Sequence, residues 1–208
     1  MSAASGAPLP RTQPLSWLQP ALLWGSLLPF VWLVLRALTG ELGANPIATA
    51  LNQLGLLALI FLWACLACTP LKLLFGWNWP IRVRKTLGLL GFFTALTHFL
   101  FYLAVDQGFA LGKVLTDVGK RPFIAVGFLA LLLLVPLAVT STKKALQRLG
   151  FRTWKRLHRL VYVVAVLAFV HFLLRVKTHD GQPLVYGAVV GVLFAVRLGG
   201  FVRQRRKR

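Results

Sequence analysis

The chain has 208 residues and a net charge of +20, yet 58% of its residues are hydrophobic and only 13% are charged. Soluble domains carry roughly a quarter charged residues, so this composition argues against a soluble domain and indicates a membrane protein. The charge also does not indicate nucleic-acid binding, because the basic residues lie in short segments between apolar runs and at the C-terminus.

Six apolar runs are long enough, or nearly so, to cross a bilayer as helices. A hydrocarbon core of about 30 Å needs roughly 20 apolar residues in helical form. Glycine and proline punctuate the gaps, for example between Pro70 and Pro80, and no linker or repeat divides the chain. We therefore predict an all-α fold, a six-transmembrane helix bundle that forms one domain over residues 1–208. The predicted spans are 21–38, 47–66, 87–105, 123–140, 160–176 and 184–201.

Basic residues are distributed unequally between the two sides that these spans define. One side holds all four acidic residues and only six of the 24 Lys and Arg residues; the other side, which includes both chain ends, holds the rest. Cytoplasmic segments are the ones enriched in Lys and Arg, where they also meet anionic lipid. We therefore predict that both termini are cytoplasmic. No convincing cleavage site follows Arg11, so we expect the first span to stay attached.

The two cysteines, Cys65 and Cys68, lie in the second apolar run. Helical backbone geometry disfavours a disulfide at this spacing. The CxxC spacing also occurs in redox and metal sites. The simpler interpretation is a pair of small, buried, apolar side chains.

Two histidines, His98 and His171, lie inside the third and fifth predicted spans. An ionisable side chain within a membrane span is costly and usually functional. Each lies 14 residues beyond the cytoplasmic start of its span, at Arg84 and Leu157 respectively, which places both about 21 Å into the membrane. Two imidazoles at one depth suit the axial positions of one haem. Such ligation leaves no open site for oxygen and suits electron transfer.

One face of the third span is nearly bare of large side chains. Residues at spacings of 3 and 4 share this face, and we predict that a flat macrocycle lies along it. Ordinary packing of helices through small residues is the alternative. The residues of this face are Arg84, Gly88, Gly91, Ala95, His98 and Tyr102.

His158 lies at the cytoplasmic boundary of the fifth span. It precedes His171 by 13 residues, roughly 140° around an ideal helix, so the two rings do not share a face. Two interpretations stay open: an interfacial histidine beside lipid headgroups, or a ligand or neighbour of a second cofactor. In the second case its level partner is Arg84, which cannot bind iron but can pair with a propionate, a phosphate or a quinone oxygen. His179, beside Asp180 in an outer loop, is expected to be solvated.

Four segments carry a resemblance to a known family: RKTLGLLGFFTALTHFLFY at 84–102, KRPFIAVG at 120–127, PLAVTS at 136–141 and RLGFRTWKRLHRLVY at 148–162. In these segments the chain resembles the ferric-reductase-like transmembrane domain family. Within that family it is most similar to haem-binding membrane subunits of bacterial systems that repair oxidised periplasmic methionine. The resemblance covers essentially the whole chain. It implies a multi-pass protein of the bacterial inner membrane that carries haem b, and FMN has also been associated with the family.

The resemblance further implies partners. Electrons would come from the quinone pool or a cytoplasmic flavin reductase and would pass to a periplasmic molybdopterin-containing methionine-sulfoxide reductase. The chain would thus be an electron-transfer subunit of an oxidoreductase complex and not its catalytic subunit. No flavin and nicotinamide domain follows Phe201, so we expect the electrons to arrive from another molecule.

The resemblance also implies roles for individual residues. His98 and His171 match the family's haem histidines, and His158 matches its third. Arg84 stands where ferric reductases and NADPH oxidases carry another histidine on the third span. The number of haems, one or two, is therefore left open by the sequence.

A haem-free small transporter or membrane assembly scaffold is the alternative function. It would use the polar residues of the spans for packing alone. The sequence argues against transport, because it has no inverted repeat and no acidic residue within a span for ion coupling.

Overall fold

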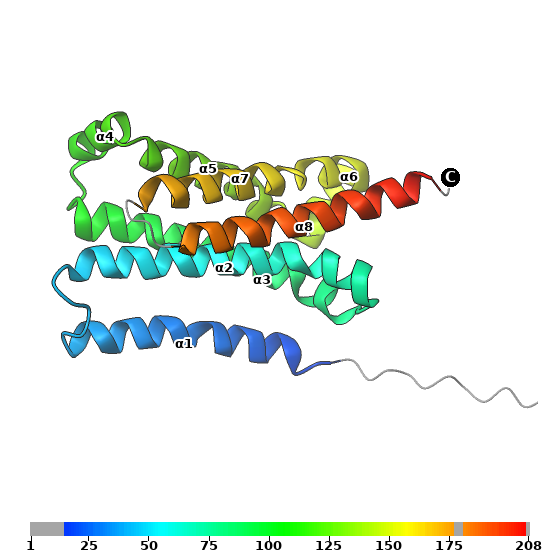
Figure 1. Ribbon diagram of the computed structural model, residues 1–208, viewed down its shortest axis with the longest axis horizontal. Helices are drawn as coiled ribbons and strands as arrows, with labels where there is room; N and C mark the ends of the chain where they lie inside the picture. The colour runs from blue at the N-terminus through cyan, green and yellow to red at the C-terminus, as the bar shows by residue number, and fades with distance from the viewer. Residues whose placement is uncertain (1–14, 177–180, 207–208) are drawn as a thin grey trace, which may run out of the picture.

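The computed structural model describes residues 15–176 and 181–206, and all regular structure in these ranges is helical (Figure 1). The predicted all-α fold is therefore confirmed. Both described chain ends lie at the same end of the bundle (Figure 1). The helices are α1 (Leu18–Leu38), α2 (Pro46–Phe75), α3 (Trp79–Phe101), the π-helical turn η1 (Tyr102–Asp106), α4 (Leu111–Lys120), α5 (Pro122–Val139), α6 (Lys143–Leu157), α7 (Leu160–Arg175) and α8 (Gln182–Arg205).

Each predicted span corresponds to one of the long helices, namely α1, α2, α3 with η1, α5, α7 and α8. Five of these are long and apolar enough to cross a membrane by themselves. The exception is α7, which has only 16 residues. It passes the same test only together with α6, from which it is bent by 45°. The described helices thus supply five or six spans, and the six-span arrangement stays a prediction.

Helix α2 continues through part of the predicted break between Pro70 and Pro80 and ends at Gly76, whose φ is 71°. The prediction was wrong about Pro70, which lies inside the helix. Because Pro70 has no N–H, the carbonyl of Leu66 lacks its usual helical donor. Arg197 of α8 donates to that carbonyl instead. A neighbouring helix therefore satisfies the freed group and lets α2 continue.

Two helices were not predicted, α4 and α6, and they lie at opposite ends of the bundle (Figure 1). Neither is long and apolar enough to cross a membrane by itself. Helix α6 begins at Thr142, whose hydroxyl oxygen accepts a hydrogen bond from the backbone N–H of Ala145 at 3.1 Å. The predictions for Arg11, His179 and Asp180 concern residues outside the described ranges.

The best-packed core lies where α2 meets α5, α7 and α8. Val164 and Ala165 of α7 have no exposed surface. The indole N–H of Trp63 on α2 donates to the carbonyl of Tyr186 on α8 at 3.1 Å, which fixes these two helices to each other. The buried residues of this core are Leu59, Leu62, Trp63, Leu66, Leu134, Val164, Ala165 and Val190.

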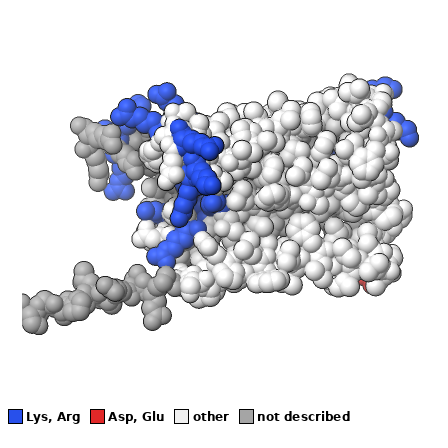
Figure 2. Space-filling view, turned by 180° about the vertical axis from the view of Figure 1, so that it is seen from behind, with Lys and Arg blue, Asp and Glu red and all other residues white. Residues whose placement is uncertain are grey.

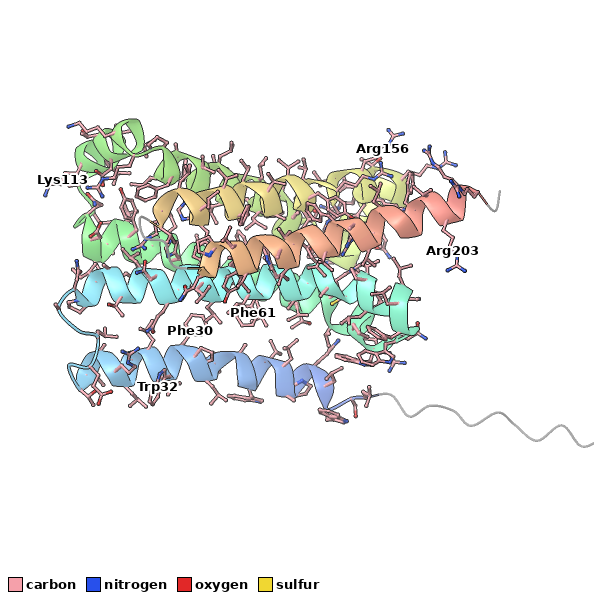
Figure 3. All side chains as sticks on the ribbon, in the orientation of Figure 1. Phe30, Trp32, Phe61, Lys113, Arg156 and Arg203 are labelled. Atoms are coloured by element: carbon pink, nitrogen blue, oxygen red, sulfur yellow. The ribbon has the colours of Figure 1, made fainter. Side chains whose placement is uncertain are left out.

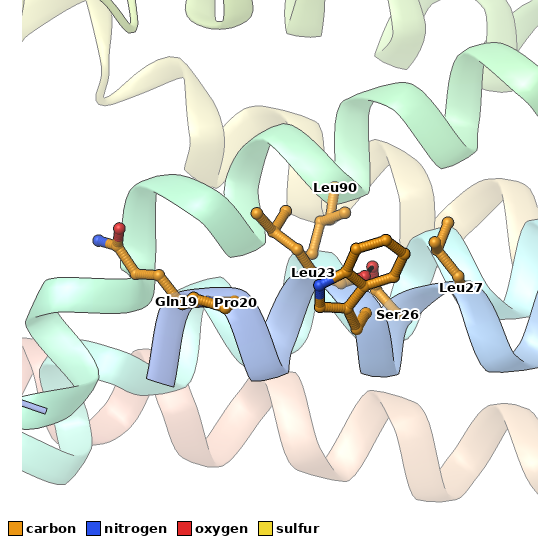
Figure 4. A pocket seen from close by; sticks show the side chains of 7 residues that line it. Gln19, Pro20, Leu23, Ser26, Leu27 and Leu90 are labelled. Atoms are coloured by element: carbon orange, nitrogen blue, oxygen red, sulfur yellow. Dashed lines mark hydrogen bonds between the residues drawn. The ribbon is translucent and has the colours of Figure 1, made fainter. Parts of the chain in front are cut away.

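Helix α1 is, with α8, among the least buried of the long helices, and it lies against α2 and α3. Beside it, an apolar groove of about 500 Å³ separates α1 from Leu90 of α3 (Figure 4). Most of the outer face of α1 consists of exposed large apolar side chains, including Trp24 and Trp32. Such a surface is stable only against lipid, as expected for a peripheral span.

On the face shown in Figure 2, charged side chains gather at the two ends of the bundle and leave the middle nearly free of charge. Most Lys and Arg residues lie at the end that holds α6 and the two described chain ends. Figure 3 shows Arg156 and Arg203 at that end and Lys113 at the other. We call the first the basic end and the second the opposite end.

Candidate haem site

The structure brings His98 of α3 and His171 of α7 together. Their ring centroids lie 6.3 Å apart, and the ring planes are inclined by 79°. A metal–imidazole bond is about 2 Å long and each ligating nitrogen lies roughly 1.2 Å from its ring centroid, so two rings on opposite sides of one metal ion have centroids about 6.4 Å apart. The observed spacing therefore fits two axial ligands of one metal.

The ring of His171 is oriented by the first turn of α5. Its Nδ1 donates a hydrogen bond to the carbonyl of Phe123 at 2.6 Å. A carbonyl only accepts, so the proton is on Nδ1 and the lone pair of Nε2 is free. A second hydrogen bond that fixes the tautomer in this way is typical of metal-binding histidines.

Gly127 makes this contact sterically feasible. A Cβ atom at this position would lie 2.5 Å from Nδ1 and 2.7 Å from Cε1 of His171. Any other residue would therefore displace the ring. The absence of a side chain lets the imidazole lie directly on the backbone of α5.

His98 is seated in a similar way against α2. A Cβ atom at Gly55 would lie 3.2 Å from Cε1 of His98. The Nδ1 of His98 is buried and makes no hydrogen bond. A buried polar atom without a partner is costly and is typical of a site that a ligand completes.

The donor set fits a haem better than a bare metal ion. Within residues 15–176 and 181–206, no group of three or more His, Cys, Asp or Glu side chains converges on one point. Two histidines alone suit an iron whose equatorial ligands come from a macrocycle. Aromatic rings lie alongside: Phe123 is 6.0 Å from His171, and Phe99 is 5.5 Å from Phe128 between ring centroids.

The glycine face of α3 does not leave space for a macrocycle, and that prediction was wrong. A Cβ at Gly88 would lie 3.3 Å from Sγ of Cys65, and one at Gly91 would lie 3.4 Å from the backbone nitrogen of Leu62. Both glycines face α2 and let the two helices pack closely, which is the alternative interpretation. The glycines that seat the histidine rings instead lie on α2 and α5.

His158 lies between α6 and α7, where its ring stacks on Trp154 at 3.9 Å. The hydroxyl of Thr140 donates to the carbonyl of Pro136 at 2.6 Å, so it accepts from Nε2 of His158 at 3.1 Å. Partial burial and the nearby charge of Arg84 lower the pKa of His158, which keeps the ring neutral. The structure thus gives Nε2 of His158 a protein partner, and its role toward a cofactor stays a prediction.

Arg84 and the two cysteines lie together near the basic end of α2 and α3. Nη1 of Arg84 donates to the hydroxyl of Thr69 at 3.4 Å. The thiol of Cys65 donates to the carbonyl of Arg84 at 3.3 Å. Both cysteines are free thiols; Cys68, of which 1% is exposed, is a buried packing residue as predicted, whereas Cys65 is only half-buried.

Sequence reasoning missed Arg197. It was counted with the basic residues of the C-terminal end, but it lies inside α8 and its guanidinium points into the bundle, where it contacts α2 and α7. The sequence did contain a signal for this position, because Arg197 is a charged residue within the predicted span 184–201.

A polar cluster closes the opposite end of the bundle near η1. Asp117 of α4 accepts hydrogen bonds from the hydroxyl of Tyr102 and from the side-chain amide of Gln107, both at 3.3 Å. Its carboxylate also pairs with Arg121 at 3.5 Å. These contacts fix α4 against the end of α3, one turn beyond His98.

Taken together, a helical membrane bundle and two facing, buried histidines on different helices define a class of multi-pass membrane proteins suited to carry haem. The family model described as "Ferric reductase like transmembrane component" matches residues 49–169. The chain belongs to this ferric-reductase-like transmembrane family and is a multi-pass membrane protein.

Individual relatives are similar over nearly their whole length. A "Protein-methionine-sulfoxide reductase heme-binding subunit MsrQ" of Rhodospirillum rubrum is 50% identical over 180 residues, which is 86% of each chain. The protein of the same name from Deinococcus radiodurans is 49% identical over 188 residues, or 90% of this chain and 93% of its own. That of Herminiimonas arsenicoxydans is 45% identical over 200 residues, or 95% and 92%.

Proposed function

We propose that the chain is a haem-b-binding electron-transfer subunit of a protein-methionine-sulfoxide reductase system. It passes electrons across the inner membrane to a periplasmic molybdopterin-containing reductase. The observation that carries this proposal is the 6.3 Å spacing of His98 and His171, with a backbone cradle behind each ring. The names of its relatives support the same assignment.

In this proposal the imidazoles of His98 and His171 would hold the haem. The bound group would supply a one-electron couple, which suits electron transfer and not oxygen chemistry. Phe123 keeps the proton on Nδ1 of His171, which leaves Nε2 to the metal. The ring of Phe123 lies beside the imidazole of His171, with 6.0 Å between the ring centroids.

The decisive functional experiment follows electrons out of the protein. Purified protein is reduced with dithionite, freed of excess reductant and mixed with the periplasmic reductase and a methionine-sulfoxide substrate. We expect the reduced haem band to decay with formation of methionine. A band that persists in the presence of active reductase and substrate would contradict the proposed acceptor.

The proposal includes six spans with both termini in the cytoplasm. The gathering of Lys and Arg at the end that holds both described chain ends supports it (Figure 2). We expect alkaline phosphatase fused after Arg208 to be inactive and the same enzyme fused at Gly43, in the loop before α2, to be active. Activity at the C-terminal fusion together with inactivity at Gly43 would contradict this orientation.

Electrons enter from the basic end in this scheme, from a quinol or a cytoplasmic flavin reductase. We predict that His158→Ala keeps at least four-fifths of the haem, because His158 is bonded to Thr140 and lies on a different level from His171. Reduction by quinol or by the flavin reductase should slow several-fold, while reduction by dithionite stays unchanged. The measurement is stopped-flow haem reduction; equal slowing with all reductants would contradict a donor-side role.

Two further features of the proposal, the number of haems and the binding of FMN, each need a measurement of their own. Haem quantitation against protein concentration separates one haem from two. A flavin extracted with acid from purified protein would support FMN binding, which at present rests on the family resemblance alone.

A further inference from the structure

Arg197 is held inside the bundle by three helices. From α8, its Nη1 donates to the hydroxyl of Tyr162 on α7 at 2.7 Å, and its Nη2 donates to the carbonyl of Leu66 on α2. The guanidinium carbon lies 5.4 Å from the ring centroid of Tyr162. The side chain is therefore half-buried and is directed toward α2 and α7.

One donor of this guanidinium is left over. Nε of Arg197 is buried and has no hydrogen-bond partner, and the only other such side-chain atom in the described part of the chain is Nδ1 of His98. Leaving a charged donor buried and unpaired is costly, more so than for a neutral donor. A buried nitrogen without a hydrogen-bond partner, which indicates a ligand at His98, is therefore also found at Arg197.

Within residues 15–176 and 181–206, no carboxylate pairs with Arg197. The one salt bridge in the described residues joins Arg121 to Asp117 at the opposite end. A half-buried cation with no carboxylate paired to it in the described residues favours the binding of a negatively charged group.

A purely structural role accounts for only part of this arrangement. Pro70 leaves the carbonyl of Leu66 without a donor, and Nη2 of Arg197 fills that place. An uncharged donor would do the same at lower cost. Neither the positive charge nor the buried Nε–H is needed for this bond.

We infer that Arg197 binds the oxyanion of a ligand in the basic half of the bundle, between α2, α7 and α8. Carboxylate and phosphate groups match the planar guanidinium and its parallel N–H donors. Two molecules of a membrane haem protein carry an oxyanion of this kind. A haem carries the carboxylate of a propionate, and a membrane phospholipid carries the phosphate of its headgroup. In the haem case the inference rests on the proposed function and adds a residue that anchors the cofactor.

The test compares Arg197→Gln with Arg203→Gln, an exposed arginine on the same helix that serves as the matched control. Both variants are purified as the haem-loaded protein. The first readout is the rate of haem transfer to added apomyoglobin. The second is the increase in unfolding temperature when phosphatidylglycerol, instead of phosphatidylcholine, is added to the micelles.

We expect Arg197→Gln, unlike Arg203→Gln, to change one readout strongly. Haem transfer at least five-fold faster would identify the oxyanion as a propionate. Loss of the phosphatidylglycerol-dependent increase, with unchanged haem transfer, would identify it as a lipid phosphate. Values equal to the wild type in both readouts would overturn the inference.

A second variant controls for the possibility that Arg197→Gln alone fails to fold. Pro70→Ala supplies a backbone N–H for the carbonyl of Leu66 and removes the structural need for Arg197. The double variant Pro70→Ala/Arg197→Gln should fold and still show the altered readout, whereas wild-type values would mean that Arg197 is only structural. Wild-type protein without haem would contradict the proposed function, while the lipid readout would still test Arg197.

Discussion

Replacing either His98 or His171 with alanine will reduce the bound haem at least ten-fold. Each ring supplies one of only two protein ligands, and no other histidine in the described residues lies beside them. The apoprotein should still fold, because neither ring belongs to the buried core formed around Val164 and Ala165. The measurement is haem per protein in membranes grown with excess haem precursor, by the pyridine haemochrome method.

His158→Ala is the matched control for this experiment, since it removes a histidine from the basic end. It should retain haem, as argued above. External imidazole should partly restore haem to His98→Ala, because Gly55 and the deleted ring leave a cavity of suitable shape. Retention of the full haem content by both His98→Ala and His171→Ala would contradict the proposed ligands.

Gly127→Val is expected to have the second-largest effect, although this residue bears no ligand. Even a Cβ would lie 2.5 Å from Nδ1 of His171, so the ring must move away from Phe123 and lose its hydrogen bond. The tautomer is then no longer fixed, and the ring no longer keeps its place beside His98. Overpacking of this kind costs about 1–3 kcal/mol in stability. We expect haem content to fall several-fold and the remaining haem spectrum to shift.

Gly191→Val is the control for this prediction. Gly191 lies in α8, and a Cβ there would meet nothing within 4 Å. It should retain the haem content and the spectrum of the wild type. Gly127→Ala should fall between the two, since its single methyl group forces a smaller displacement. Normal haem content and an unchanged spectrum in Gly127→Val would contradict the described seat of His171.

The sequence predicted the positions of the long helices well, because each apolar run must be helical to satisfy its backbone in lipid. It also predicted that His98 and His171 lie at one depth, since helical rise converts residue number into distance. The structure places their rings 6.3 Å apart. Their identity as haem ligands remains a prediction.

What the sequence did not predict depends on which helices become neighbours. Gly88 and Gly91 looked like space for a macrocycle, but they face α2 and serve close packing. Gly55 and Gly127, which seat the histidine rings, were not singled out, because their distance from each ring is set by tertiary packing. Arg197 was counted as a surface cation for the same reason.

The central claim is that His98 and His171 together hold one haem b in the outer half of the bundle. A reduced-minus-oxidised spectrum of the purified protein, with haem quantitation and low-temperature electron paramagnetic resonance, tests it most directly. We predict the α-band of a b-type haem and a low-spin ferric signal typical of two imidazole ligands, both absent from His98→Ala and His171→Ala. Purified, folded protein that shows no haem absorbance after expression with excess haem would contradict the claim.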